Sequence, residues 1–206
     1  MNPRIGLLGG SFDPIHYGHL AIAEEARVTL QLDRVVFVPA ARQPLKHGRH
    51  GAASAQRFEM ARLACASNIT FEVSPIEIER PGPSYSVITL EEFHKTHPGE
   101  YYFILGADAA SDLGHWYAAE RIIELARIVV AGRPGATPDR EQLILTFPRL
   151  AERMLAVAGP RLDISSTLLR ERVTAGQSIR YLTPEPVVEY IMRHQLYGSV
   201  YPSELL

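Results

Sequence analysis

Residues 5–20, IGLLGGSFDPIHYGHL, decide how the fold is expected to begin. Residues 5–8 form the short apolar run of a buried strand, and Gly9 and Gly10 allow a tight turn after it. A helix is expected to begin near Gly18. Because the free backbone N–H groups of a helix N-terminus attract negative charge, a strand, a glycine turn and a helix in this order predict a site for an anion.

Two histidines mark this turn as a phosphate site. His16 and His19 are three residues apart, which places both imidazoles on one side of the first helical turn, where they can donate hydrogen bonds to phosphate oxygens. Phe12 and Asp13 are expected to shape the turn, and Gly18 is expected to let the backbone pass close to a ligand. The alternative is a loop with two solvated histidines, and the position of the motif directly after the first strand favours the phosphate site.

Short apolar runs alternate along the chain with longer segments in which apolar residues recur at helical spacing. Continuous apolar strands separated by helix-length crossovers predict a doubly wound α/β fold, with a parallel sheet covered on both faces. Ligands are expected at the carboxyl ends of the strands. The expected strands span residues 5–8, 34–38, 70–73, 101–105, 128–131 and 161–164, and the expected helices span residues 19–30, 55–66, 85–94, 118–126 and 184–196.

Length and composition indicate one globular domain, residues 1–206, with a helical C-terminal portion from about residue 166. The net charge of -2 gives no global attraction to nucleic acid or to anionic membranes, so an anionic ligand must be held by local features. Cys65 is the only cysteine and lies in a small apolar run, which excludes a disulfide framework and predicts a buried, inert thiol. No apolar stretch approaches the roughly 20 residues that span a bilayer, so the cytoplasm is the expected location.

A second motif, ISSTLLR, lies at residues 164–170. It follows the last expected strand, and the hydroxyl groups of Ser165, Ser166 and Thr167 suit the N-cap of another helix. Such a helix N-terminus, backed by the guanidinium of Arg170 one turn in, can bind the outer phosphates of ATP. The alternative is an ordinary capped helix with a surface arginine. There is no G-x-x-x-x-G-K-S/T sequence and the N-terminal glycines do not form G-x-G-x-x-G, which disfavours a Walker NTPase and a dinucleotide oxidoreductase.

Together the two motifs resemble the H-x-G-H and I-S-S-T-x-x-R signatures of the nucleotidyltransferase superfamily. Within it the chain is similar to the bacterial nicotinate mononucleotide adenylyltransferases over nearly its whole length. Two departures are mild: Ser11 stands where that family often has threonine, and Ile88 replaces a usual aspartate. The further matches are Phe103 to Asp108, Leu113 with Trp116 and Tyr117, Arg133 to Gly135, Tyr181 to Pro184, Tyr190 with Ile191, and Leu196 with Tyr197.

The resemblance implies a Rossmann-like nucleotidyltransferase fold and transfer of the adenylyl group of ATP to nicotinate mononucleotide, a step in NAD synthesis. The residues agree with that chemistry, because a phosphate oxygen is the attacking group and catalysis can rest on alignment and on stabilising charge. The expected catalytic residues are His16, His19 and Arg170, with His19 stabilising the transition state and Arg170 binding the leaving pyrophosphate. Magnesium is expected to arrive with ATP, without a metal site of the protein's own.

The segment between Ala40 and Phe58 is expected to contribute to ATP binding, because its only charged side chains are basic. Lys46 carries the resemblance there, and a solvated loop is the alternative. Asp108, after the strand at 101–105, is expected to accept a hydrogen bond from ribose or adenine, and its alternative role is a helix N-cap. The expected ATP-binding residues are Gly9, Gly10, Ser11, Phe12, Gly18, Lys46, Gly106, Asp108, Ser165, Ser166 and Thr167.

For the mononucleotide the expected residues are Thr89, Trp116, Tyr117 and Arg133. Aromatic rings at Trp116 and Tyr117 can stack on a nicotinate ring, and core packing is the alternative. In the family that the chain resembles, the aromatic at Trp116 lines the base pocket, while Thr89 and the backbone near Tyr117 lie near the nicotinate carboxylate. Arg133 is expected to reach a phosphate, although a surface arginine needs no special role.

Three other functions stay open at this stage. A pantetheine-phosphate adenylyltransferase is disfavoured by chain length and by the motifs in the middle of the chain. A nicotinamide mononucleotide enzyme differs only in one small substrate group, and sequence alone does not locate the backbone donors that discriminate it. A non-catalytic nucleotide-binding regulator would be expected to have lost part of one phosphate motif, and both motifs are intact.

Overall fold

The computed structural model describes residues 2–42, 51–132, 140–159 and 162–198, and its centre is a six-stranded sheet. The strand order is β3-β2-β1-β4-β5-β6, and all five pairings are parallel. Because β1 lies between β2 and β4, the strand order reverses there, at the position where open α/β sheets bind ligands. The predicted doubly wound fold is confirmed. The strands are β1 (Arg4–Gly10), β2 (Arg34–Pro39), β3 (Phe71–Val73), β4 (Glu100–Gly106), β5 (Arg127–Gly132) and β6 (Met154–Ala158).

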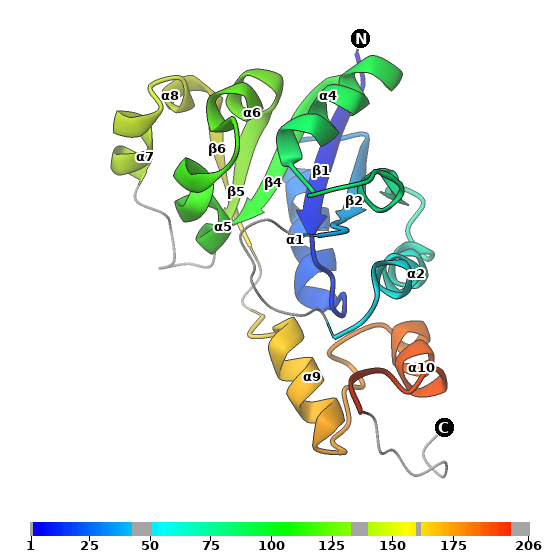
Figure 1. The fold of residues 1–206 in the computed structure, drawn as a ribbon. Coiled ribbons are helices and arrows are strands. Elements are labelled where there is room, and N and C mark those ends of the chain that lie inside the picture. The colour runs from blue at the N-terminus through cyan, green and yellow to red at the C-terminus, as the bar shows by residue number, and fades with distance from the viewer. Residues whose placement is uncertain (1, 43–50, 133–139, 160–161, 199–206) are drawn as a thin grey trace.

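Helices cover both faces of the sheet (Figure 1). α1 (Tyr17–Thr29) and α2 (Ser54–Cys65) share one core with Leu8, whereas α4 (Ser86–Thr96) and α6 (Ala119–Leu125) share the other core with Leu7. Successive residues of β1 thus point to opposite faces, as the pleat of a strand requires. Within the described ranges, no helix is both long and apolar enough to cross a membrane.

The C-terminal part is helical and lies beyond the carboxyl ends of the strands (Figure 1). It contains α9 (Ser166–Thr174), α10 (Glu185–Arg193) and the 3-10 turn η2 (Leu196–Gly198). Leu169 of α9 and Ile191 of α10 are buried in the same core as α1 and α2. Cys65 belongs to this core, and burial raises the pKa of its thiol to about 12, as expected for a buried, unreactive cysteine.

The last strand is not where the sequence predicted it. β6 spans Met154–Ala158 and pairs with β5, whereas residues 162–164 have no regular structure, so the strand predicted at 161–164 is wrong. The run 154–158 contains two alanines, which fit strands poorly, and pairing with β5 overrides this weak local preference. Five short elements also lack a clear periodic signal: α3 (Ile76–Glu79), α5 (Ala107–Ser111), η1 (Asp112–His115), α7 (Arg140–Thr146) and α8 (Leu150–Arg153).

Candidate active site

The predicted turn between β1 and α1 lies at the carboxyl end of the central strand. Residues 11–16 connect Gly10 to Tyr17, and we call this segment the phosphate loop. Its last residue, His16, has extended backbone angles and is the N-cap of α1. A strand, a glycine turn and a helix N-terminus therefore follow one another as the sequence predicted.

Phe12 fixes the shape of the turn from inside the protein. Its side chain is buried and its backbone has a positive φ of 49°, which is unusual for a residue with a side chain. A Cβ added at Gly10 would lie 2.9 Å from the Phe12 ring, so glycine is needed there for close packing. The ring also meets His19 edge-on, with 5.1 Å between centroids. The Phe12 side chain thus packs inside the turn and against His19, and contact of its backbone with ATP stays a prediction.

The two histidines form one unit. Their rings are stacked at a centroid distance of 3.7 Å and an interplanar angle of 28°. The backbone N–H of His16 donates to Nδ1 of His19 at 3.2 Å, which leaves the proton of a neutral His19 ring on Nε2. A Cβ at Gly18 would lie 3.0 Å from both Cε1 and Nδ1 of His16. The glycine between the histidines is therefore required by the His16 ring itself.

His16 is the more buried of the pair and carries no charge at neutral pH. Only 6% of the residue is exposed, and burial lowers its pKa from 6.5 to about 4. Its Nδ1 atom is buried and has no hydrogen-bond partner among the described residues. A buried polar atom without a partner is uncommon in native proteins and marks a place where a ligand or water can complete the site.

Side-chain donors from distant parts of the chain hold the carbonyl oxygens of the phosphate loop. Arg57 comes from α2, Arg170 and Ser166 from α9, and Thr183 from the segment before α10. Bound in this way, the carbonyl oxygens are paired within the protein, which lowers their repulsion of an anion. The four bonds are Arg57 Nη1 to Ser11 O (2.6 Å), Arg170 Nη1 to Asp13 O (2.7 Å), Ser166 Oγ to Pro14 O (2.8 Å) and Thr183 Oγ1 to Ile15 O (2.7 Å).

The side chain of Asp13 ties the loop to two further segments. It is 4% exposed and accepts hydrogen bonds from the backbone N–H of Gly51 (2.8 Å), from that of Ala52 (3.1 Å) and from the hydroxyl of Tyr197 (2.8 Å). Burial, followed by the charge of Asp13, raises the pKa of Tyr197 above its usual range. The carboxylate thus holds the start of the α2 segment and the C-terminal turn against one loop.

Arg57 is an internal residue and not part of an exposed basic segment. It is 1% exposed and donates to three carbonyl oxygens, at Ser11 (2.6 Å), Ala41 (3.2 Å) and Ala52 (3.3 Å). Burial lowers the pKa of its guanidinium, and Asp13 counteracts that shift. Sequence reasoning missed its structural role, although a signal existed. The buried positions of α2 are Arg57, Met60, Ala61, Ala64 and Cys65, which is the spacing of one helix face.

The second motif lies against the first, as expected for a shared site. Ser165 is the N-cap of α9 and accepts from the N–H of Leu168 at 3.1 Å. Ser166 bonds the phosphate loop, and Thr167 Oγ1 accepts from Arg170 Nη2 at 3.2 Å. Arg170 also bonds Asp13 O, so this arginine is tied to the phosphate loop. Its contact with pyrophosphate stays a prediction.

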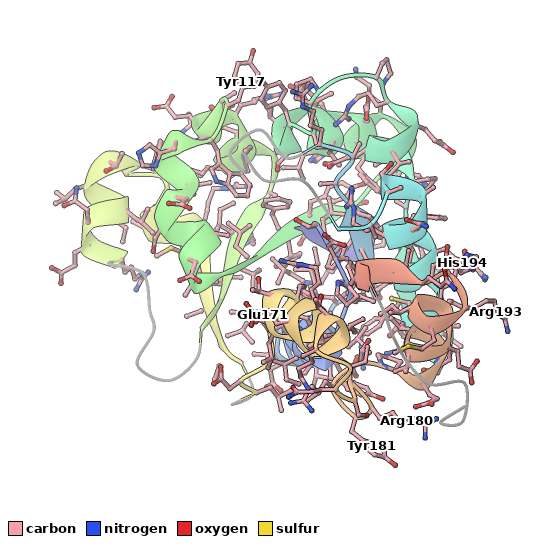
Figure 2. All side chains as sticks on the ribbon, turned by 60° about the horizontal axis from the view of Figure 1, so that its bottom comes forward. Tyr117, Glu171, Arg180, Tyr181, Arg193 and His194 are labelled. Carbon is pink, nitrogen blue, oxygen red and sulfur yellow. The ribbon has the colours of Figure 1, made fainter. Side chains whose placement is uncertain are left out.

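The residues predicted to bind the mononucleotide differ in how far they are buried. Trp116 is half-buried and meets Phe103 edge-on at 5.9 Å, so it contributes to the second core. Tyr117 is 63% exposed and points outward (Figure 2), with its ring 4.8 Å from that of Tyr85. Thr89 is 2% exposed. Its hydroxyl is already bonded within the protein, as described below.

Asp108 is not a helix N-cap. Gly106 is the N-cap of α5, and Asp108 is an exposed residue in the first turn of that helix. A Cβ added at Gly106 would meet nothing within 4 Å, so open space lies beside the end of β4. Lys46 and Arg133, the remaining predicted site residues, lie outside the described residues.

Comparison with known proteins identifies the family to which this protein belongs. A family model described as cytidylyltransferase-like matches residues 7–172, which include both motifs. A solved structure, the nicotinic acid mononucleotide adenylyltransferase of Plasmodium falciparum complexed with NaAD, has the same fold with a TM-score of 0.75. It is 20% identical in sequence, and the match covers 96% of this chain and 98% of that one. The chain belongs to the cytidylyltransferase-like family.

Similar proteins of known name narrow the assignment within this family. One from Roseiflexus sp. (strain RS-1), named as a probable nicotinate-nucleotide adenylyltransferase, is 60% identical over 193 residues, or 94% of this chain and 97% of the relative. Another from Herpetosiphon aurantiacus with the same name is 48% identical over 195 residues, covering 94% and 98% of the two chains. Within its family, the chain groups with the nicotinate-nucleotide adenylyltransferases, as the sequence motifs indicated.

We expect His16 to stay neutral throughout the physiological pH range. In the folded protein its pKa is about 4, whereas the unfolded chain takes up the proton at about 6.5. Between these values the unfolded state binds more protons, so this group's stabilising contribution is complete above about 6.5 and falls as the pH drops toward about 4. NMR titration of the imidazole Cε1–H signal, assigned with His16→Gln, measures the pKa directly. A midpoint near the ordinary value would contradict the burial described above.

Proposed function

We propose that the protein transfers the adenylyl group of ATP to nicotinate mononucleotide and releases pyrophosphate. One observation carries the proposal: motifs from opposite ends of the chain meet, because Ser166 and Arg170 bind the carbonyl oxygens of Pro14 and Asp13. Two adjacent helix N-termini, each with hydrogen-bond donors, suit a polyphosphate better than a single phosphate. The names of the full-length relatives supply the second substrate.

The proposed reaction is a displacement at the α-phosphorus of ATP. A phosphate oxygen of nicotinate mononucleotide forms a bond to this phosphorus, and the bond from the phosphorus to the oxygen that bridges to the β-phosphate breaks. Pyrophosphate leaves with the electron pair of the broken bond, and nicotinate adenine dinucleotide is the second product. The step requires no nucleophile from the protein, so the protein aligns the substrates and stabilises the charge that builds up.

We assign the charge stabilisation to the histidine pair. His19 accepts from His16 through Nδ1, so its Nε2–H is the donor that can face the α-phosphate. His16 is neutral, with an unpaired buried Nδ1, and an anion bound beside it would raise its pKa. Arg170 has five N–H donors, so it can bond Asp13 and Thr167 and still bind the leaving pyrophosphate.

The nucleoside part of ATP is proposed to lie where β1 and β4 end. A Cβ at Gly9 would meet only the Phe103 ring, at 4.0 Å, and one at Gly106 would meet nothing within 4 Å. Packing within the protein therefore does not require glycine at either position, which supports a close approach of the ligand there. Asp108, exposed in the first turn of α5, is proposed to accept a hydrogen bond from the ribose or adenine. The proposed roles of Lys46 and Arg133 concern residues outside the described part of the chain.

Magnesium is proposed to enter with ATP. Among the described residues, no group of three or more histidine, cysteine, aspartate or glutamate side chains is placed to bind a metal ion. The carboxylate of Asp13, which lies nearest the histidines in sequence, already accepts hydrogen bonds from Gly51, Ala52 and Tyr197. Phosphate oxygens and water are therefore the ligands proposed for the metal, which supplies charge neutralisation when bound.

The nicotinate ring is proposed to lie near Trp116 and Tyr117. Trp116 packs against Phe103, and the exposed ring of the next residue, Tyr117, packs against Tyr85. Thr89 lies in the first half of the neighbouring helix α4. Its buried hydroxyl makes an indirect contribution to substrate binding more consistent with the structure than a direct one.

A pyrophosphate-release assay tests the proposed function. The protein is incubated with ATP, magnesium and either nicotinate or nicotinamide mononucleotide. We expect kcat/KM for the nicotinate substrate to exceed that for the amide. Turnover mainly of the amide would contradict the substrate assignment, and no turnover of either would instead support a nucleotide-binding regulator.

His19→Ala is expected to lower kcat by roughly 10²-fold or more, because it removes a donor that stabilises the transition state. His194→Ala is the matched control, since His194 is an exposed histidine at the end of α10 (Figure 2). Both variants should keep the circular dichroism spectrum of the parent protein. Near-normal turnover of a folded His19→Ala protein would remove His19 from the reaction.

A further inference from the structure

A buried carboxylate outside the phosphate loop links the two sides of the proposed site. Glu77 lies in the short helix α3 and is 7% exposed. Its Oε1 accepts from the Thr89 hydroxyl at 2.6 Å. Burial raises the pKa of Glu77, although the hydroxyl groups of Thr89 and Ser84 counteract the shift. The short bond ties the buried acid of α3 to α4.

Arg80 extends the network to the next turn of α4. Its Nη2 donates to Thr89 Oγ1 at 3.0 Å, and its Nη1 donates to Glu92 Oε2 at 2.6 Å. The Thr89 hydroxyl therefore receives one hydrogen bond from Arg80 and gives one to Glu77. Thr89 is buried, and its hydroxyl already donates one hydrogen bond and accepts another. It therefore has little hydrogen-bonding capacity left for a substrate.

Ser84 connects Glu77 to the end of β2. Its Oγ accepts from the N–H groups of Ala41 (2.9 Å) and Arg42 (3.3 Å), and its own N–H donates to Arg42 O at 2.9 Å. The carbonyl of Ala41 in turn accepts from Arg57, which also bonds Ser11 of the phosphate loop. A chain of hydrogen bonds therefore runs from Ser84, which neighbours Glu77, through the backbone of Ala41 and the side chain of Arg57 to the phosphate loop.

The same network fixes the N-terminus of α4. Tyr85, the N-cap residue, follows Ser84 directly and packs on Tyr117, one of the residues proposed to lie beside the nicotinate ring. A displacement of Ser84 would move Tyr85 relative to β2. Because Tyr85 packs on Tyr117, such a movement would change the surface proposed to bind the mononucleotide.

We infer that Glu77 is a positioning residue for the mononucleotide, which holds the α4 N-terminus in register with the end of β2 through Thr89 and Ser84. This inference rests on the proposed function. It assigns to Thr89 an indirect role, through Glu77, in place of direct contact with the substrate. Glu77 itself touches neither substrate in this scheme.

Glu77→Gln tests the inference, because it keeps the shape of the side chain but replaces one acceptor oxygen with a donor group. We expect the KM for nicotinate mononucleotide to rise about tenfold, the equivalent of one net hydrogen bond, with kcat and the KM for ATP within about twofold of the parent values. The matched control is Glu79→Gln, an exposed residue two positions along the same helix. Ser84→Ala provides an independent variant that breaks the link to β2 and leaves Glu77 in place.

The outcomes are distinguishable. A selective rise in the mononucleotide KM in Glu77→Gln or, if that variant does not fold, in Ser84→Ala supports the positioning role. A folded Glu77→Gln protein with the KM of the Glu79→Gln control contradicts it. So does an equal change in both KM values together with kcat, which a purely structural role would give. If the parent protein turns over no mononucleotide, the proposed function fails and this inference fails with it.

Discussion

The carbonyl oxygens of four residues in the phosphate loop, Ser11, Asp13, Pro14 and Ile15, impose the constraint on which the rest of the site depends. A loop that binds an anion must turn N–H groups toward it, and the carbonyl groups then need partners elsewhere, because an unpaired buried carbonyl costs about 1–3 kcal/mol. Arg57, Ser166, Arg170 and Thr183 supply these partners. They belong to α2, α9 and the segment before α10, so the C-terminal helices must lie beyond the carboxyl ends of the strands for the loop to keep its shape.

The proposed anion site therefore depends on local features and not on the net charge of -2. Both histidines are proposed to act as hydrogen-bonding groups, since burial keeps His16 uncharged and His19 receives a bond from the His16 backbone. The mononucleotide side is similar, because the buried Glu77 carboxylate has the Thr89 hydroxyl as its hydrogen-bond partner and not a cation. The two networks meet at Ala41, whose backbone contacts Ser84 on one side and Arg57 on the other.

Sequence reasoning predicted what depends on local pattern and failed where long-range pairing decides. The glycine turn, the histidine pair and the capped helix at residue 165 carry local signals, and the structure has each of them. The strand at 154–158 was missed because its alanines are poor strand formers and β5 supplies the pairing. Arg57 was read as part of a basic segment, and only the 57-60-61-64 spacing indicates that it points inward. The burial of Thr89 depends on Glu77 and Arg80, whose proximity no spacing in the sequence reveals.

The most direct test of the loop constraint changes Tyr197, a residue far from the phosphate loop in sequence. Tyr197→Phe removes a hydrogen bond to the Asp13 carboxylate and leaves the ring in place. If the buried donors set the shape of the loop, kcat/KM for ATP should fall about tenfold in a protein that remains folded, as the loss of one net hydrogen bond predicts. Tyr181→Phe, at a tyrosine that is 89% exposed, should leave it unchanged (Figure 2). Equal kcat/KM values for the two variants would contradict the dependence of the site on these bonds.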